Sequence, residues 1–139
     1  MPHITSKTDN RLLWTAQGLL ALLFFFAGVM KFVMPIEEMQ GPVAFPLSFI
    51  RFIGVAEILG ALGLILPGLL RIRTMLTSVA ASGLTIIMIG ATAVTISGMG
   101  MAPALFPFTV GLVAATIAYR RRHVVPLREG SLEPVLQTT

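Results

Sequence analysis

Three ionisable side chains occupy segments that are otherwise apolar enough to cross a membrane. Lys31 lies near the end of one apolar run, and Arg51 and Glu57 lie near the start of the next. A helix that begins at residue 47 would place Glu57 about 15 Å from its start, close to the middle of the bilayer. Charged groups at that depth are costly, so such a residue indicates a functional site or a buried ion pair.

Lys31 and Glu57 are predicted to face each other. Side chains on a helix lean toward its N-terminus, so a lysine on one helix and a glutamate on the returning helix lean together. The short connection between the two runs makes these helices neighbours. The competing interpretation is that Lys31 extends its ammonium to the membrane surface. We favour the pair, because surface extension would oppose the lean of the side chain.

These charges also predict a polar pocket near the outer leaflet. Arg51 and Glu57 flank Gly54 on the helical wheel, and two threonines of the third apolar run reach the level of Arg51. Ammonium, guanidinium and hydroxyl groups donate hydrogen bonds, which suits the carbonyl oxygens of a quinone or the charge of an anion. The candidate ligand-binding or charge-pair residues are therefore Lys31, Arg51, Glu57, Thr92 and Thr95.

Several kinds of chemistry are excluded by residue types. The chain has no cysteine, which excludes disulfides and cysteine-bound clusters. His3 and His123 fall outside the apolar runs, and the eight methionines lack metal-ligand spacing and suit core filling. We therefore predict no metal site and no cofactor, with a quinone as the organic ligand that the donors would suit. Whether the chain is an enzyme stays open, and a role without catalysis of its own is favoured.

The elements that must position these residues are transmembrane helices. The chain is 55% hydrophobic and only 12% charged, against about 25% charged in a typical soluble domain. Apolar runs cover about residues 12–34, 47–66, 74–97 and 104–119. Lipid cannot satisfy backbone polar groups, so each run must be helical. The first run is too long for a signal peptide, and we expect it to be retained. The sequence therefore predicts an all-α, four-transmembrane-helix bundle.

Basic residues set the expected orientation. They fall on one side of the membrane if the chain crosses it four times, and they are Lys7, Arg11, Arg71, Arg73, Arg120, Arg121, Arg122 and Arg128. The positive-inside rule then predicts that both termini are cytoplasmic, with tails over residues 1–11 and 121–139 around a membrane domain at 12–120. We expect a multi-pass protein of the plasma or inner membrane. The same placement accounts for a pI of 10.8 through lipid contacts, without nucleic-acid binding.

Glycines recur along the apolar runs and are predicted to let helices approach one another closely. The expected packing positions are Gly28, Gly54, Gly60, Gly63, Gly83, Gly90 and Gly111. A homo-oligomer stays open, in addition to contacts with the lipid bilayer.

Three segments resemble one family of membrane proteins. They are FFFAGVMKF (Phe24–Phe32), RFIGVAEILGALGLILPG (Arg51–Gly68) and IIMIGAT (Ile86–Thr92). Over roughly residues 12–120 the chain resembles the DoxX-like family of small four-helix integral membrane proteins. The pattern G-x-x-K ending the first helix and R-x-x-G-x-x-E-x-x-G-A-x-G-L opening the second together carry the resemblance. Many such sequences have a histidine shortly after the third-helix alanine, whereas here TAVT follows Ala91.

The resemblance implies a fold and a membrane location. It also links the chain to relatives associated with thiosulfate–quinone oxidoreductases, oxidative-stress enzymes and, in animals, receptor assembly. We therefore expect an accessory subunit of a redox or quinone-linked membrane system, with an oxidoreductase as partner protein. Two alternatives stay open: an assembly or chaperone-like protein whose buried charges are structural, and a small proton-coupled transporter. The lack of tryptophan and tyrosine near Glu57 disfavours an aromatic cage for a cationic drug.

Overall fold

The computed structural model describes residues 7–39, 41, 43–73 and 75–123. These residues form the helices α1 (Lys7–Val33), α2 (Ile36–Met39), α3 (Leu47–Leu69), α4 (Met75–Met99) and α5 (Met101–His123). Four of them, all but the short α2, are long and apolar enough to span a bilayer. Within the described ranges all regular structure is helical. The predicted all-α class with four membrane-spanning helices is therefore confirmed.

The helix α3 continues past its predicted end at residue 66, through Pro67 to Leu69. Pro67 has no backbone N–H to donate and lies in the last turns of α3. Its carbonyl accepts a hydrogen bond from the Ile72 N–H (3.0 Å). The Arg71 N–H donates to the Gly68 carbonyl (3.4 Å), and Arg71 has a φ of 52°. Such a pair of bonds around a left-handed residue closes a helix and turns the chain sharply, here toward α4.

The connection between α4 and α5 is Gly100 alone, although the sequence predicted a loop over residues 98–103. Gly100 has a φ of 91°, which glycine adopts without the steric penalty of a Cβ atom. The helix α5 then starts at Met101 and not at residue 104, because Pro103 lies in the first turn. There the backbone N–H groups have no partner within the helix, so a proline removes no bond.

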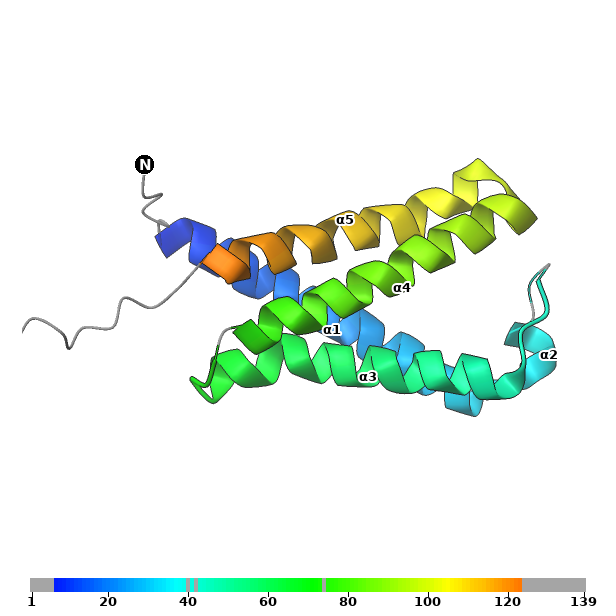
Figure 1. Cartoon of the computed structure of the whole chain (residues 1–139), viewed down its shortest axis with the longest axis horizontal. Helices are drawn as coiled ribbons and strands as arrows, with labels where there is room; N and C mark the ends of the chain where they lie inside the picture. The colour runs from blue at the N-terminus through cyan, green and yellow to red at the C-terminus, as the bar shows by residue number, and fades with distance from the viewer. Residues whose placement is uncertain (1–6, 40, 42, 74, 124–139) are drawn as a thin grey trace, which may run out of the picture.

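The four long helices form two antiparallel hairpins, α1 with α3 and α4 with α5 (Figure 1). The hairpins are joined mainly where α4 packs on α3, and α1 meets α5 over a shorter stretch. They spread apart toward the end that carries α2 (Figure 1). Accordingly, the buried residues of α4 all precede residue 85, and the later part of α4 has less cover from the chain itself.

The core lies where the two hairpins converge. Each long helix contributes one large apolar side chain that is almost completely buried, namely Phe24, Leu64, Leu84 and Ile117. Burial of such side chains fixes how the helices face one another. Many of the other large apolar residues on α1, α3, α4 and α5 are exposed, as expected of helices that face lipid.

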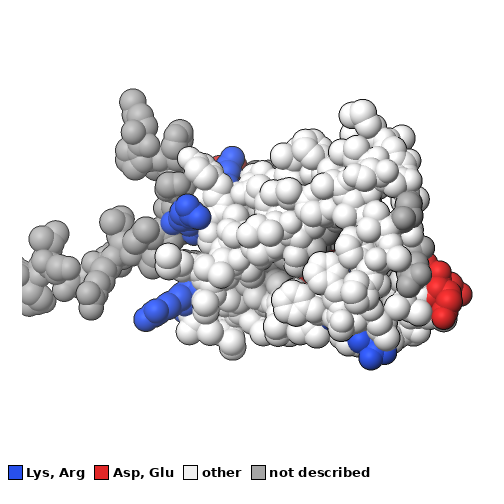
Figure 2. Space-filling model, turned by 45° about the vertical axis from the view of Figure 1, so that its right-hand side comes forward, with Lys and Arg blue, Asp and Glu red and all other residues white. Residues whose placement is uncertain are grey.

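Charges gather at the two ends of the molecule, and the surface between them is uncharged on the face in Figure 2. We call one end the basic end. It carries the start of α1, the turn between α3 and α4 and the end of α5 (Figure 1), with the cations Lys7, Arg11, Arg71, Arg73, Arg120, Arg121 and Arg122. The opposite end, the α2 end, carries Glu37 and Glu38. That the basic end faces the cytoplasm remains a prediction of the positive-inside rule.

Candidate functional site

An ion pair joins the first two membrane helices. The Lys31 Nζ atom of α1 lies 2.7 Å from the Glu57 Oε2 atom of α3. Glu57 is only 3% exposed, whereas the Lys31 side chain keeps 26% of its surface exposed. The ammonium also lies 3.5 Å from the Ala27 carbonyl of its own helix. Since the carboxylate is buried and the ammonium is partly open, Lys31 is the accessible member of the pair.

Two glycines bring the helices close enough for this pair to form. A Cβ atom added to Gly28 would lie 2.8 Å from the Gly54 carbonyl oxygen and 2.7 Å from the Ile58 side chain. A Cβ atom added to Gly54 would lie 3.1 Å from the Gly28 carbonyl oxygen and 3.2 Å from Lys31 Cβ. Backbone therefore meets backbone at this crossing. The contact places the lysine and the glutamate, on either side of it, within hydrogen-bonding reach.

Replacing Gly28 with alanine is expected to destabilise the α1–α3 hairpin by about 2 kcal/mol, because a backbone carbonyl must move to admit the methyl group. The free energy of unfolding, measured by titrating sodium dodecyl sulfate into detergent micelles, would detect this loss. Gly90→Ala is the matched control, since no atom lies within 4 Å of its added Cβ. An equal effect of both changes would contradict a specific role for the crossing.

Among the described residues, no salt bridge or side-chain hydrogen bond joins the other three candidate residues to this pair. Arg51 is exposed, because six residues along a helix place it about 120° around α3 from the buried Glu57. The Thr92 hydroxyl donates to the Met88 carbonyl and the Thr95 hydroxyl to the Ala91 carbonyl, each at 2.7 Å. Hydroxyls in helices commonly bond the preceding turn in this way. The contact that the structure gives is thus a pair between α1 and α3, and a wider pocket that also takes in Arg51, Thr92 and Thr95 stays a prediction.

The remaining glycines of the prediction divide into two groups. Added Cβ atoms at Gly60, Gly63 and Gly111 would meet Leu84, Ala80 and Met88 on neighbouring helices, at 2.6, 2.7 and 3.0 Å. Gly83 and Gly90 instead face open space, with no atom within 4 Å. They were expected at helix contacts, but α4 turns them away from α3 and α5.

A second buried polar cluster, at the basic end, was missed from sequence. The Gln17 amide donates to the Leu64 carbonyl (2.7 Å) and accepts from Arg121 Nε (2.7 Å), so it links α1, α3 and α5. Arg121 is 9% exposed, lies over the Trp14 ring at 5.6 Å, and has an Nη2 atom without a partner. From the sequence, Arg121 was predicted only to be one of the basic residues that set the orientation in the membrane. The feature of the sequence that could have revealed this cluster is Gln17, because a side-chain amide within an apolar run requires a polar partner.

Within residues 7–39, 41, 43–73 and 75–123, no group of three or more metal-ligating side chains lies together. The chemistry that the ion pair itself can supply is hydrogen-bond donation. A lysine ammonium has three N–H donors, and the two contacts described leave at least one of them for a ligand.

The fold and the site together define the class of protein. It is a helical membrane protein with four spans and an ion pair between the first two. The model of the DoxX-like family matches residues 15–118. The match covers most of the chain, so the protein belongs to the DoxX-like family. No curated protein and no solved structure matched the chain.

Proposed function

We propose that this protein is an accessory membrane subunit of a quinone-linked redox system, and that Lys31 donates a hydrogen bond to a carbonyl oxygen of the quinone. The observation that carries the proposal is the asymmetry of the ion pair. Glu57 is buried and holds the ammonium in place, while the Lys31 side chain is 26% exposed and retains a donor. A donor held in an apolar region is what recognition of a lipid-soluble carbonyl compound requires.

The proposal assigns electron transfer to a partner and not to this chain. The chain has no cysteine, and its two histidines lie at positions 3 and 123, outside the apolar core of each span. Its own residues therefore bind and orient, and a partner oxidoreductase supplies the redox group. Membership of the DoxX-like family is compatible with this role.

Quinone-dependent stabilisation tests the proposal. Ubiquinone-1, a short-chain quinone, is added to the purified protein in detergent and the midpoint of thermal unfolding is measured. We expect a rise for the wild type and for Arg51→Met, which removes an exposed charge at the same end. We expect none for the double variant Lys31→Met/Glu57→Leu, which removes both partners and so leaves no unpaired buried charge.

A rise that persists in the double variant would show that Lys31 is not the donor. No rise in the wild type would remove the quinone from the proposal. Native co-purification from membranes tests the accessory role separately. An oxidoreductase is the expected partner, and recovery of the chain without any redox protein would argue against it.

One observation favours a second candidate, an assembly protein whose ion pair is structural. The pair lies directly beside the Gly28–Gly54 crossing, where it could fix the register of α1 against α3. Buried ionic groups specify one packing arrangement in some proteins. The same double variant separates the candidates. If it binds quinone normally but fails to recover its partner from membranes, the structural role is favoured.

A further inference from the structure

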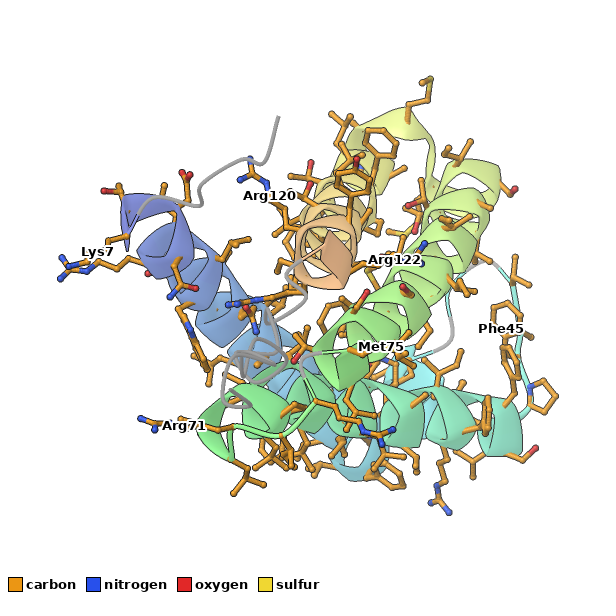
Figure 3. The ribbon with its side chains drawn as sticks, turned by 60° about the vertical axis from the view of Figure 1, so that its left-hand side comes forward. Lys7, Phe45, Arg71, Met75, Arg120 and Arg122 are labelled. Atoms are coloured by element: carbon orange, nitrogen blue, oxygen red, sulfur yellow. The ribbon has the colours of Figure 1, made fainter. Side chains whose placement is uncertain are left out.

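A groove on the outside of α4 lies apart from the ion pair, at the basic end. It has a volume of about 460 Å³ and is lined by Met75, Ser78, Val79, Ser82, Gly83 and Ile86 of α4 and by Arg122 of α5. Figure 3 shows Met75 and Arg122 on the same side of the molecule, where the ends of α4 and α5 lie side by side. Gly83 opens the wall of the groove, because no atom lies within 4 Å of the position of its missing Cβ.

The walls of this groove suit an apolar ligand. Val79 and Ile86 are 62% and 70% exposed, and Met75 is 67% exposed. The two serines do not offer free donors, since the Ser78 hydroxyl donates to the Ala118 carbonyl (2.7 Å) and the Ser82 hydroxyl donates to the Ser78 carbonyl (2.8 Å). A ligand that lies along these residues therefore contacts hydrocarbon and backbone. Its binding energy there comes from van der Waals packing and not from hydrogen bonds to the serines.

The charge of the groove lies at one end only. Arg122 is exposed and forms no salt bridge with any described residue. Its guanidinium is a planar fork that binds phosphate oxygens in pairs. A ligand that fits both features has an anionic head at the basic end and an apolar body that runs toward the middle of the membrane.

The length of the groove agrees with a lipid chain. From Met75 to Ile86 the axis of α4 advances about 16 Å at 1.5 Å per residue, which is close to half of the ~30 Å hydrocarbon core. The groove therefore spans one leaflet, from the interface at the basic end to the bilayer centre. We infer that this groove is a binding site for an anionic phospholipid, with the phosphate on Arg122 and one acyl chain along Val79, Gly83 and Ile86.

Native mass spectrometry of the full chain in detergent tests the inference, with palmitoyl-oleoyl phosphatidylglycerol as the anionic probe and the matching phosphatidylcholine as the neutral one. Gly83→Leu fills the groove and is expected to remove the bound lipid. Gly90→Leu is its control, because Gly90 is equally open but lies outside the groove. Both changes replace an exposed helical glycine with a better helix former, so both variants should fold.

The head group is tested on the arginines. Arg122→Gln is expected to weaken binding of phosphatidylglycerol about tenfold, the loss of one charge-assisted hydrogen bond, and to remove the preference over phosphatidylcholine. Arg120→Gln, an exposed neighbour, should keep that preference. Equal lipid binding by Gly83→Leu and Gly90→Leu would overturn the groove as the site. An unchanged preference in Arg122→Gln, or an equal loss in Arg120→Gln, would overturn the role of Arg122.

Discussion

Replacing Lys31 with methionine is expected to lower the free energy of unfolding by about 3 kcal/mol, because the change leaves the Glu57 carboxylate buried without its partner. The two atoms lie 2.7 Å apart, and Glu57 is 3% exposed, so the carboxylate depends on the ammonium for its partner. The partial exposure of Lys31 keeps the expected loss at the lower end of the range for buried pairs. Titration with sodium dodecyl sulfate, followed by circular dichroism, measures this quantity.

The control for this change is Arg51→Met, which removes a cation from the same end of the molecule. Arg51 is exposed and forms no salt bridge with the described residues, so its loss should change stability by less than about 0.5 kcal/mol. In Lys31→Met/Glu57→Leu both partners are gone, and most of the lost stability should return. If Lys31→Met is as stable as Arg51→Met, the ion pair contributes nothing to the free energy of unfolding. The quinone proposal would then lose its premise that the buried Glu57 holds the Lys31 ammonium in place.

Features that depend on neighbouring residues in the sequence could be predicted, whereas features that depend on how distant helices pack could not. The four spans follow from length and hydropathy, which are local, and Lys31 and Glu57 were placed together from the lean of side chains on adjacent helices. The ends of α3 and α5 were less well predicted. Pro67 was taken as a stop, yet α3 continues through it to Leu69, and the left-handed Arg71 closes the helix later.

The rotation of each helix could not be predicted from the sequence. Arg51 was predicted at a pocket with Glu57, and the structure leaves Arg51 exposed, about 120° around α3 from the buried Glu57, so its part in a pocket stays a prediction. Gly83 and Gly90 of α4 carry the same signal as Gly28 and Gly54, but α4 faces its partners with other residues. Small residues form a helix surface that another helix or a lipid chain can approach closely. Only the packed structure shows which of the two lies against it.

The two buried polar contacts hold different parts of the bundle. Lys31 and Glu57 act within one hairpin, α1 with α3, near the α2 end. Gln17 and Arg121 connect that hairpin to α5 at the basic end, where the hairpins converge. Since the hairpins spread apart toward the α2 end (Figure 1), we expect the contact at the basic end to have the larger part in setting the angle between them.

Replacing Gln17 with leucine should therefore loosen the junction of the two hairpins. The change leaves both Arg121 Nε and the Leu64 carbonyl without their 2.7 Å partners in a buried site, at an expected cost of about 3 kcal/mol. Trp14 is the single tryptophan of the chain and lies 5.6 Å from the Arg121 guanidinium, so its fluorescence reports the junction directly. We expect its emission to change at a lower denaturant concentration than in the wild type.

A double-mutant cycle separates this contact from the general effect of losing a polar group. Gln17→Leu/Arg121→Met replaces both partners with apolar side chains, so its loss should be smaller than the sum of the single losses by at least about 1 kcal/mol. Thr116→Val is the control for removing a polar group on α5, because its exposed hydroxyl bonds only the Leu112 carbonyl of its own helix. Additive losses in the cycle would mean that Gln17 and Arg121 contribute independently. The angle between the hairpins would then depend on the apolar core around Leu64 and Ile117 alone.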